Sequence, residues 1–119
     1  MSHKMIVQDV IDLDDGKHKG TIVSLENVTR GSAKYEYTDV VIRPNGKKWE
    51  IKAGFPTRMS KQTALGKLWE RLTEKTLIEG EEVDLEEIIG IPIEFTVYHK
   101  TEDGKKFLEV LHETIERVV

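Results

Sequence analysis

Hydrophobic and polar residues alternate along most of the chain, which is the pattern of half-buried β-strands. The alternation is clearest in the segment 48–54, where Trp49, Ile51 and Ala53 are separated by charged residues. The segment 91–99 alternates in the same way. The pattern predicts five strands, at Lys17–Val28, Lys34–Arg43, Lys48–Gly54, Ile91–His99 and Lys106–Ile115.

The segment between the third and fourth predicted strands follows a helical period instead. Apolar residues recur there at the spacing of one helical face: Ala64, Leu65, Leu68, Trp69 and Leu72. We therefore predict an amphipathic helix from Lys61 to about Thr73, with Ser60 as its N-cap. A one-turn helix is expected further on, beginning at Asp84 and ending at Gly90.

Turn residues divide the predicted strands into hairpins. Asn45-Gly46 and Asp103-Gly104 supply the positive φ angles of tight hairpin turns. Gly20 predicts a bend in the first strand. Each face of the second strand mixes polar and apolar residues, so we predict a bulge within that strand.

The order of these elements limits the fold to few choices. Three strands, a helix and two more strands are the order of the OB-fold, a five-stranded Greek-key barrel with one α-helix between strands three and four. The predicted class is thus mainly β (α+β), and the helix is expected to plug one end of the barrel. An open α+β roll is the alternative. We expect an N-terminal arm at 1–15 and a single OB-like domain at 16–119.

Several short motifs resemble small OB-fold single-stranded-DNA-binding-like proteins of phages, plasmids and archaea. The resemblance covers roughly Gly16–Ile115. The matching pieces are Gly54-Phe55-Pro56, the Ser-capped helix with Leu65-Gly66-Lys67-Leu68, Val83-Asp84-Leu85 and Ile89-Gly90. It implies binding of single-stranded nucleic acid on the face of the second and third strands and the adjoining loops.

Composition adds limits on the kind of protein. The 119 residues fit one domain, carry a net charge of −4 and contain no cysteine, which excludes disulfides and cysteine-based zinc sites. The acidic charge argues against non-specific binding of polyanions. Six carboxylates lie within Glu79–Glu87, which we interpret as a solvated acidic face. No signal peptide or apolar membrane span is recognisable, so a cytoplasmic protein without membrane attachment is expected.

Cations and aromatic residues interleave on the predicted hairpins. Single-strand binders use cations for phosphates and aromatic rings for stacking with bases. The candidate nucleic-acid-binding residues are Arg30, Lys34, Tyr35, Tyr37, Lys48, Trp49, Lys52, Lys100, Lys105 and Lys106. The alternative for each is an ordinary solvated sheet face, and Trp49 alternates in phase with Ile51 and Ala53 as a core residue would.

No catalytic motif is present, and the four histidines lack the spacing of metal ligands. We therefore predict a protein that is not an enzyme and needs no cofactor or metal. The leading hypothesis is binding of single-stranded nucleic acid, DNA rather than RNA, in replication, recombination or repair, with a phage or other mobile element as a candidate setting. A protein-interaction or assembly module of OB-like fold, with a protein partner or as a homo-oligomer, is the alternative.

Overall fold

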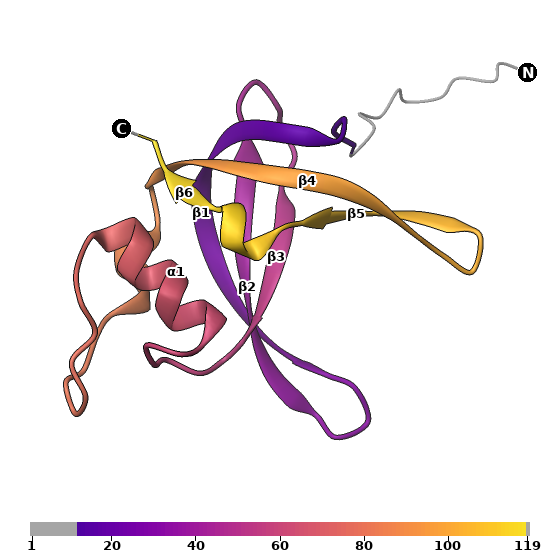
Figure 1. Ribbon diagram of the computed structural model, residues 1–119. Helices are drawn as coiled ribbons and strands as arrows, with labels where there is room; N and C mark the ends of the chain where they lie inside the picture. The colour runs from indigo at the N-terminus through magenta and orange to yellow at the C-terminus, as the bar shows by residue number, and fades with distance from the viewer. Residues whose placement is uncertain (1–11, 119) are drawn as a thin grey trace, which may run out of the picture.

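The computed structural model describes residues 12–118, and these form a mainly β structure of the α+β class. An antiparallel sheet of six strands and one α-helix make up the described part of the chain (Figure 1). The elements are β1 (Gly16–Arg30), β2 (Tyr35–Pro44), β3 (Ile51–Pro56), α1 (Ala64–Thr73), the 3₁₀ helix η1 (Leu85–Ile88), β4 (Pro92–Glu102), β5 (Lys105–Val110), the 3₁₀ helix η2 (His112–Thr114) and β6 (Glu116–Arg117).

The long strand β1 connects the two halves of the sheet. Its first residues pair with β4 and the rest of the strand pairs with β2, so that Gly20 has a partner on both sides. A Cβ atom at Gly20 would lie 2.5 Å from the carbonyl oxygen of Arg43, which explains why this position needs glycine. The only register shift in the pairing of β1 with β2 lies between Ile22 and Ser24 on β1. The bulge predicted within the second strand is therefore on its neighbour.

The strands follow the order β3-β2-β1-β4-β5, with β6 added beside β4. No hydrogen-bonded ladder joins β3 to β5 among the described residues, so the sheet is not closed into a barrel. Where these two strands approach each other, the Phe55 ring stacks on the His112 ring, with 4.1 Å between the ring centroids. A side-chain contact thus fills the place where a closed barrel would have a ladder.

Several predicted strand boundaries differ from the observed ones, and the fourth strand, for example, extends to Glu102 rather than ending at His99. The third strand begins at Ile51 rather than Lys48, because residues 47–50 belong to the turn that follows β2. The fifth strand ends at Val110 rather than Ile115, because Thr114 bonds back to Leu111 and forms η2. The short strand β6 follows at Glu116–Arg117, where no strand was predicted, and it makes six strands instead of five.

The helix is confirmed over Ala64–Thr73, but Thr63 rather than Ser60 caps it. The Thr63 hydroxyl oxygen accepts a hydrogen bond from the backbone N–H of Gly66 at 3.1 Å. Four of the five predicted stripe residues are buried, and Ala64 is exposed. The one-turn helix is also confirmed as η1, with Asp84 as its cap.

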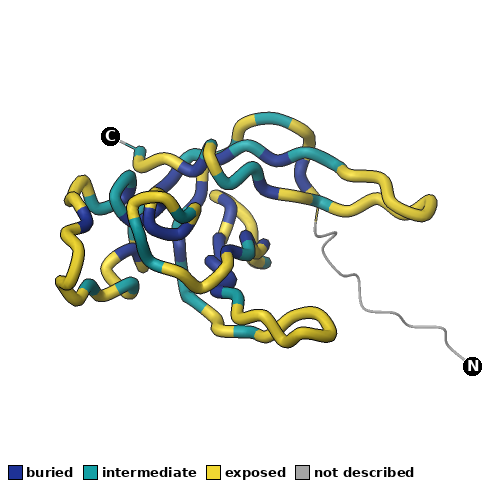
Figure 2. The backbone as a smooth tube through the Cα atoms, turned by 60° about the horizontal axis from the view of Figure 1, so that its bottom comes forward, coloured by how far each residue is buried: buried dark blue, intermediate teal, exposed yellow. Residues whose placement is uncertain are grey.

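The core lies between the sheet and α1, which covers the left side of the strands in Figure 1. The β1–β2 and β4–β5 hairpins extend away from this core, and the residues at their tips are exposed (Figure 2). The Trp69 indole N–H donates to the Asp84 carbonyl oxygen at 3.3 Å and so fixes η1 against the helix. The fully buried side chains are Phe55, Phe95, Ile22, Ile42, Leu65, Leu68, Leu72, Ile88, Ile93, Ile115, Val40 and Val97.

The predicted N-terminal arm, 1–15, falls outside the described residues as far as position 11. Its last part, 12–15, lies against β4, where His99 contacts both Asp12 and Asp15. These contacts hold the start of β1 to the neighbouring strand.

Candidate nucleic-acid interface

The outer face of β1, β2 and β3 carries the central group of predicted site residues. Alternation along β2 places Tyr37 and Asp39 on this face, and the side chain of Arg30 reaches them from β1. The Arg30 guanidinium donates to the Asp39 carboxylate at 2.8 Å and lies over the Tyr37 ring, 5.3 Å from its centroid. Arg30 is thus held between a charge and an aromatic ring.

Asp39 is a buried charge whose only partner among the described residues is Arg30. Its side chain is 3% exposed, and its second carboxylate oxygen, Oδ1, has no hydrogen-bond partner within residues 12–118. A Cβ atom at Gly54 would lie 2.5 Å from Arg30 Nη1 and 3.0 Å from Asp39 Oδ1. Glycine on β3 therefore leaves the space that this ion pair occupies.

A second ion pair lies on the same face. Lys52 donates to Glu26 at 2.8 Å, and this hydrogen bond raises the pKa of Lys52 above its ordinary value. Both side chains are about half exposed. Two of the cations predicted to bind phosphate are thus already paired with carboxylates, Arg30 with Asp39 and Lys52 with Glu26, and a bound phosphate has to compete with these partners.

Tyr35 and Lys34 lie at the end of the molecule formed by the β1–β2 hairpin. Tyr35 is 67% exposed, whereas Tyr37 is half-buried under Arg30. Lys34 occupies the turn with a positive φ of 54°. The structure therefore places Arg30, Lys34, Tyr35 and Tyr37 close together on the β1–β2 hairpin, with Lys52 further along the same face.

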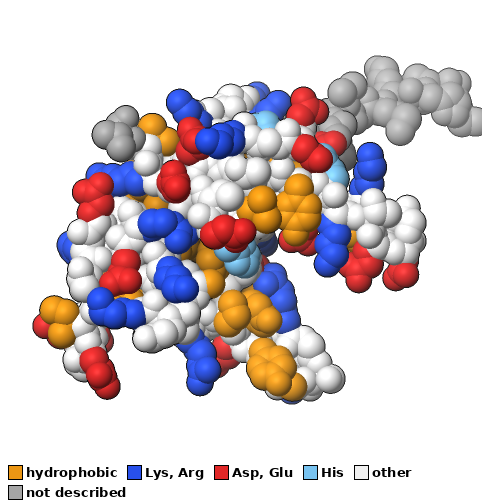
Figure 3. All heavy atoms as spheres, in the orientation of Figure 1, with side chains coloured by type: hydrophobic (Ala, Val, Ile, Leu, Met, Phe, Trp, Pro, Cys, Tyr) orange, Lys and Arg blue, Asp and Glu red, His pale blue; other side chains and the backbone are white. Residues whose placement is uncertain are grey.

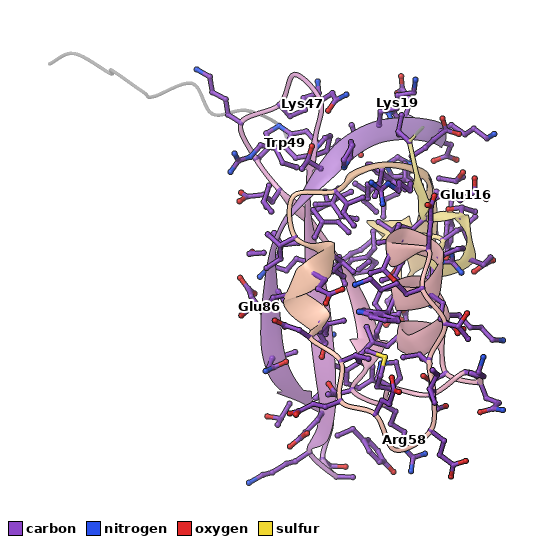
Figure 4. All side chains as sticks on the ribbon, turned by 90° about the vertical axis from the view of Figure 1, so that its left-hand side faces the viewer. Lys19, Lys47, Trp49, Arg58, Glu86 and Glu116 are labelled. Carbon is purple, nitrogen blue, oxygen red and sulfur yellow. The ribbon has the colours of Figure 1, made fainter. Side chains whose placement is uncertain are left out.

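Lys48 and Trp49 do not belong to that group. They lie in the turn between β2 and β3, and Figure 4 shows Lys47 and Trp49 at one end of the molecule and Arg58 at the other. Trp49 is partly buried and packs against the hydrophobic core, with the Lys47 ammonium 5.9 Å from its ring centroid. The prediction that these two residues lie within the third strand was wrong, because β3 begins after them, at Ile51.

The remaining predicted cations belong to the β4–β5 hairpin. Lys100, Lys105 and Lys106 are exposed there, and Lys100 is 4.0 Å from Glu102. The neighbouring Phe107 is also exposed, at 45%. Figure 3 shows hydrophobic side chains on both projecting hairpins, with a concave surface between them.

Histidine and carboxylates form a separate cluster where the arm meets β4. The two ring nitrogens of His99 lie 2.5 Å from Asp15 Oδ1 and 2.6 Å from Asp12 Oδ1. The hydrogen bond to Asp12, followed by the one to Asp15, raises the pKa of His99. The same bond lowers the pKa of Asp12. Within residues 12–118 no group of three side chains is arranged to hold a metal ion.

Sequence reasoning missed the carboxylates that accompany the cations. The alternation along β2 places Asp39 and Tyr37 on the same face, so the sequence indicates that these two residues are close. The pairing of Asp39 with Arg30, however, depends on the β1–β2 register. Arg58 is also absent from the predicted site residues, although it follows β3 and lies near the tyrosines. The register that places Pro56 opposite Tyr37 brings Arg58 there.

The chain was also compared with known proteins. No protein-family model matches it, and none of the curated proteins matches its sequence. None of the helices in the described part of the chain is long and apolar enough to cross a membrane.

Proposed function

We propose that this protein binds single-stranded nucleic acid, DNA in preference to RNA, across the surface between its β1–β2 and β4–β5 hairpins. Both hairpins project from the body of the molecule (Figure 1). Each one carries an exposed aromatic residue, Tyr35 on the first and Phe107 on the second. Lysines accompany both rings, at Lys34 on the first hairpin and at Lys105 and Lys106 on the second.

The observation that carries this proposal is the strand order β3-β2-β1-β4-β5 with α1 inserted between β3 and β4. This is the order expected for an OB-like sheet, and β6 is then an addition beside β4. In OB-folds the face of strands two and three and the two hairpin loops bind oligonucleotides. Cations and aromatic residues on those same elements therefore favour an interface for a single strand.

The charges of the surface set the expected character of binding. Arg30 and Lys52 are paired with carboxylates, whereas Lys34, Lys105 and Lys106 are in none of the ion pairs among residues 12–118. With a net charge of −4, long-range attraction of a polyanion is weak. Binding should then depend on local phosphate contacts and on stacking, and the phosphate part should weaken with salt.

The test is fluorescence anisotropy with labelled oligo-dT of about 30 nucleotides, long enough to cover the site of one such domain. We expect binding at low salt and a linear fall of the logarithm of the binding constant with the logarithm of the salt concentration. The double substitution Lys105→Gln/Lys106→Gln should make that slope less steep by about 0.7 for each phosphate contact removed.

Lys67→Gln is the matched control, because Lys67 is an exposed lysine on α1, away from both hairpins. It should leave affinity and slope unchanged. Absence of binding by the wild-type protein at low salt would contradict the proposal. Equal effects of the hairpin variant and the helix variant on binding would also contradict it.

A protein-interaction module is the second candidate, and the loop between α1 and β4 favours it. This loop carries the acidic run Glu79–Glu87 and two exposed apolar side chains, Ile78 at 57% and Ile89 at 40%. This candidate would be favoured over the first if the wild type bound a protein partner, Ile78→Asp did not bind it, and the wild type bound no oligonucleotide.

A further inference from the structure

A small pocket opens where β2 begins and β3 ends. Its lining is mostly apolar and consists of Tyr35, Glu36, Tyr37, Pro56, Thr57 and Arg58. Tyr37 lies opposite Pro56 in the β2–β3 register. The backbone N–H of Thr57 donates to the Glu36 carbonyl oxygen at 3.0 Å, which continues the pairing beyond the end of β3. A backbone hydrogen bond therefore joins the two strand ends that line the pocket.

The walls of this pocket are held in place before any ligand arrives. Arg30 covers the Tyr37 ring and is itself bound to the buried Asp39. On the other side, Pro56 has a fixed φ angle, and the Arg58 N–H donates to the Pro56 carbonyl oxygen at 2.8 Å. A tight turn thus fixes the backbone of Arg58 beside the two tyrosines.

The rim of the pocket carries positive charge. Arg58, which lines it, is exposed and takes part in no ion pair among the described residues. Glu36 is the one carboxylate among the lining residues. Arg58 is the one cation among them and is therefore the group that attracts an anion, while the tyrosines offer an apolar, planar surface. A planar ring that carries a phosphate matches this combination.

We infer that the pocket is a subsite for one base of a bound single strand, which stacks on Tyr35 and Tyr37 while Arg58 contacts the adjoining phosphate. This inference rests on the proposed function and assigns the base-binding position within it. Arg58 and Pro56 reach the site from the segment after β3. The subsite therefore combines the β1–β2 hairpin with the start of the connection to α1.

The inference is tested with two strands of equal length, oligo-dT and a strand of abasic residues that keeps the phosphates but lacks the bases. Tyr35→Ala should weaken oligo-dT binding about fivefold or more, since loss of one stacked base has at least this effect. The same variant should leave binding of the abasic strand unchanged. Arg58→Ala should weaken both, and Arg58→Lys should recover part of the loss.

Lys67→Ala serves as the control, and the urea midpoint of Tyr35→Ala confirms that it folds, as expected for an exposed side chain. If the wild type binds oligo-dT and Tyr35→Ala binds it equally well, the subsite is refuted while the proposed function stands. Equal weakening of both strands by Tyr35→Ala refutes base stacking. Failure of the wild type to bind either strand refutes the proposed function itself.

A photochemical crosslinking experiment locates the bound base independently. An oligonucleotide with 5-bromouracil in place of thymine should crosslink to Tyr35 or Tyr37 on irradiation. Digestion with trypsin should then return the adduct on the peptide 35–47, because cleavage follows Lys34 and the Arg43–Pro44 bond resists trypsin. Adducts confined to other peptides would overturn the inference.

Discussion

His99 shows how two carboxylates determine the protonation of one residue. Both of its ring nitrogens face carboxylate oxygens, those of Asp12 and Asp15. A neutral imidazole has a single N–H and satisfies only one acceptor, whereas the imidazolium donates to both. The pKa of His99 is accordingly raised above 6.5, and that of Asp12 is lowered below 3.8.

The pH dependence of this contact follows from the two shifts. Because the folded pKa of His99 is raised, its stabilising contribution is complete below about pH 6.5 and is lost as the pH rises through the raised value. Because the folded pKa of Asp12 is lowered, its contribution is complete above about pH 3.8 and is lost as the pH falls through the lowered value. Residues 12–15 should therefore be held most firmly to β4 between these two titrations.

An NMR titration of the His99 ring protons measures this directly. We expect a pKa above 6.5 in the wild type and a fall toward 6.5 in Asp12→Asn/Asp15→Asn. His112 is the internal control, since burial lowers its pKa and the double substitution should not change it. An unchanged His99 titration in the double variant would show that the carboxylates do not act on it.

At the scale of elements, the start of α1 depends on Thr63. Its hydroxyl accepts from the N–H groups of Gly66 and Ser60, both at 3.1 Å, and donates to the Arg58 carbonyl oxygen at 2.7 Å. One side chain thus caps the helix and ties it to the segment after β3. The hydroxyl of Ser60, three residues earlier, bonds only to Gln62. The backbone of Ser60 bonds to the Thr63 side chain.

We expect Thr63→Ala to lower the free energy of unfolding by about 1–2 kcal/mol, the usual effect of losing an N-cap. Ser60→Ala should cost clearly less and is the matched control, because it removes a hydroxyl from the same segment. Urea unfolding followed by tryptophan fluorescence gives both values. Equal effects of the two substitutions would argue against Thr63 as the cap.

Gly66 lies inside α1, and the reason for a glycine there comes from the fold around the helix rather than from the helix itself. Glycine inside a helix lowers stability by up to about 1 kcal/mol relative to alanine, so the sequence indicates a weak position. In the fold, however, a Cβ atom at Gly66 would lie 1.8 Å from the Ser60 carbonyl oxygen. The helix passes so close to its own leading segment that no side chain fits.

At the scale of the whole molecule, Arg71 connects the helix to the C-terminal segment. Its guanidinium donates to the carbonyl oxygens of Ile115 at 2.9 Å and His112 at 3.0 Å. Arg117 makes the reciprocal connection by donating to the Leu72 carbonyl oxygen at 3.2 Å. These bonds hold η2 and β6 against α1 on the side of the sheet where no ladder closes it.

Arg71→Met should therefore lower the free energy of unfolding by about 2–3 kcal/mol, because two backbone acceptors lose hydrogen bonds from a charged donor. Arg71 is partly buried, and the desolvation of its charge lowers its pKa. Lys67→Met, on the exposed face of the same helix, is the control and should change stability little. Denaturant titration measures both, and equal values would mean that the connection contributes nothing.

Local chemistry by itself determined much of this protein. The alternation along 91–99 and the helical stripe from Leu65 to Leu72 correspond to β4 and α1, because burial of one face needs the same spacing in any fold. Gly46, Asp103 and Gly104 have positive φ, as their turn chemistry predicts. Asp84 caps η1 through its own side chain. Each of these features depends on residues within a few positions of one another.

Features that join distant residues were decided only by the tertiary structure. The β1–β2 register pairs Arg30 with Asp39, and the β2–β3 register brings Arg58 beside Tyr37. A single bulge on β1 shifts such partners, so the spacing of residues within one strand cannot reveal them. The sequence therefore specified the elements and their order, whereas the contacts between strands decided which cations are paired and where the pocket beside Tyr35 and Arg58 opens.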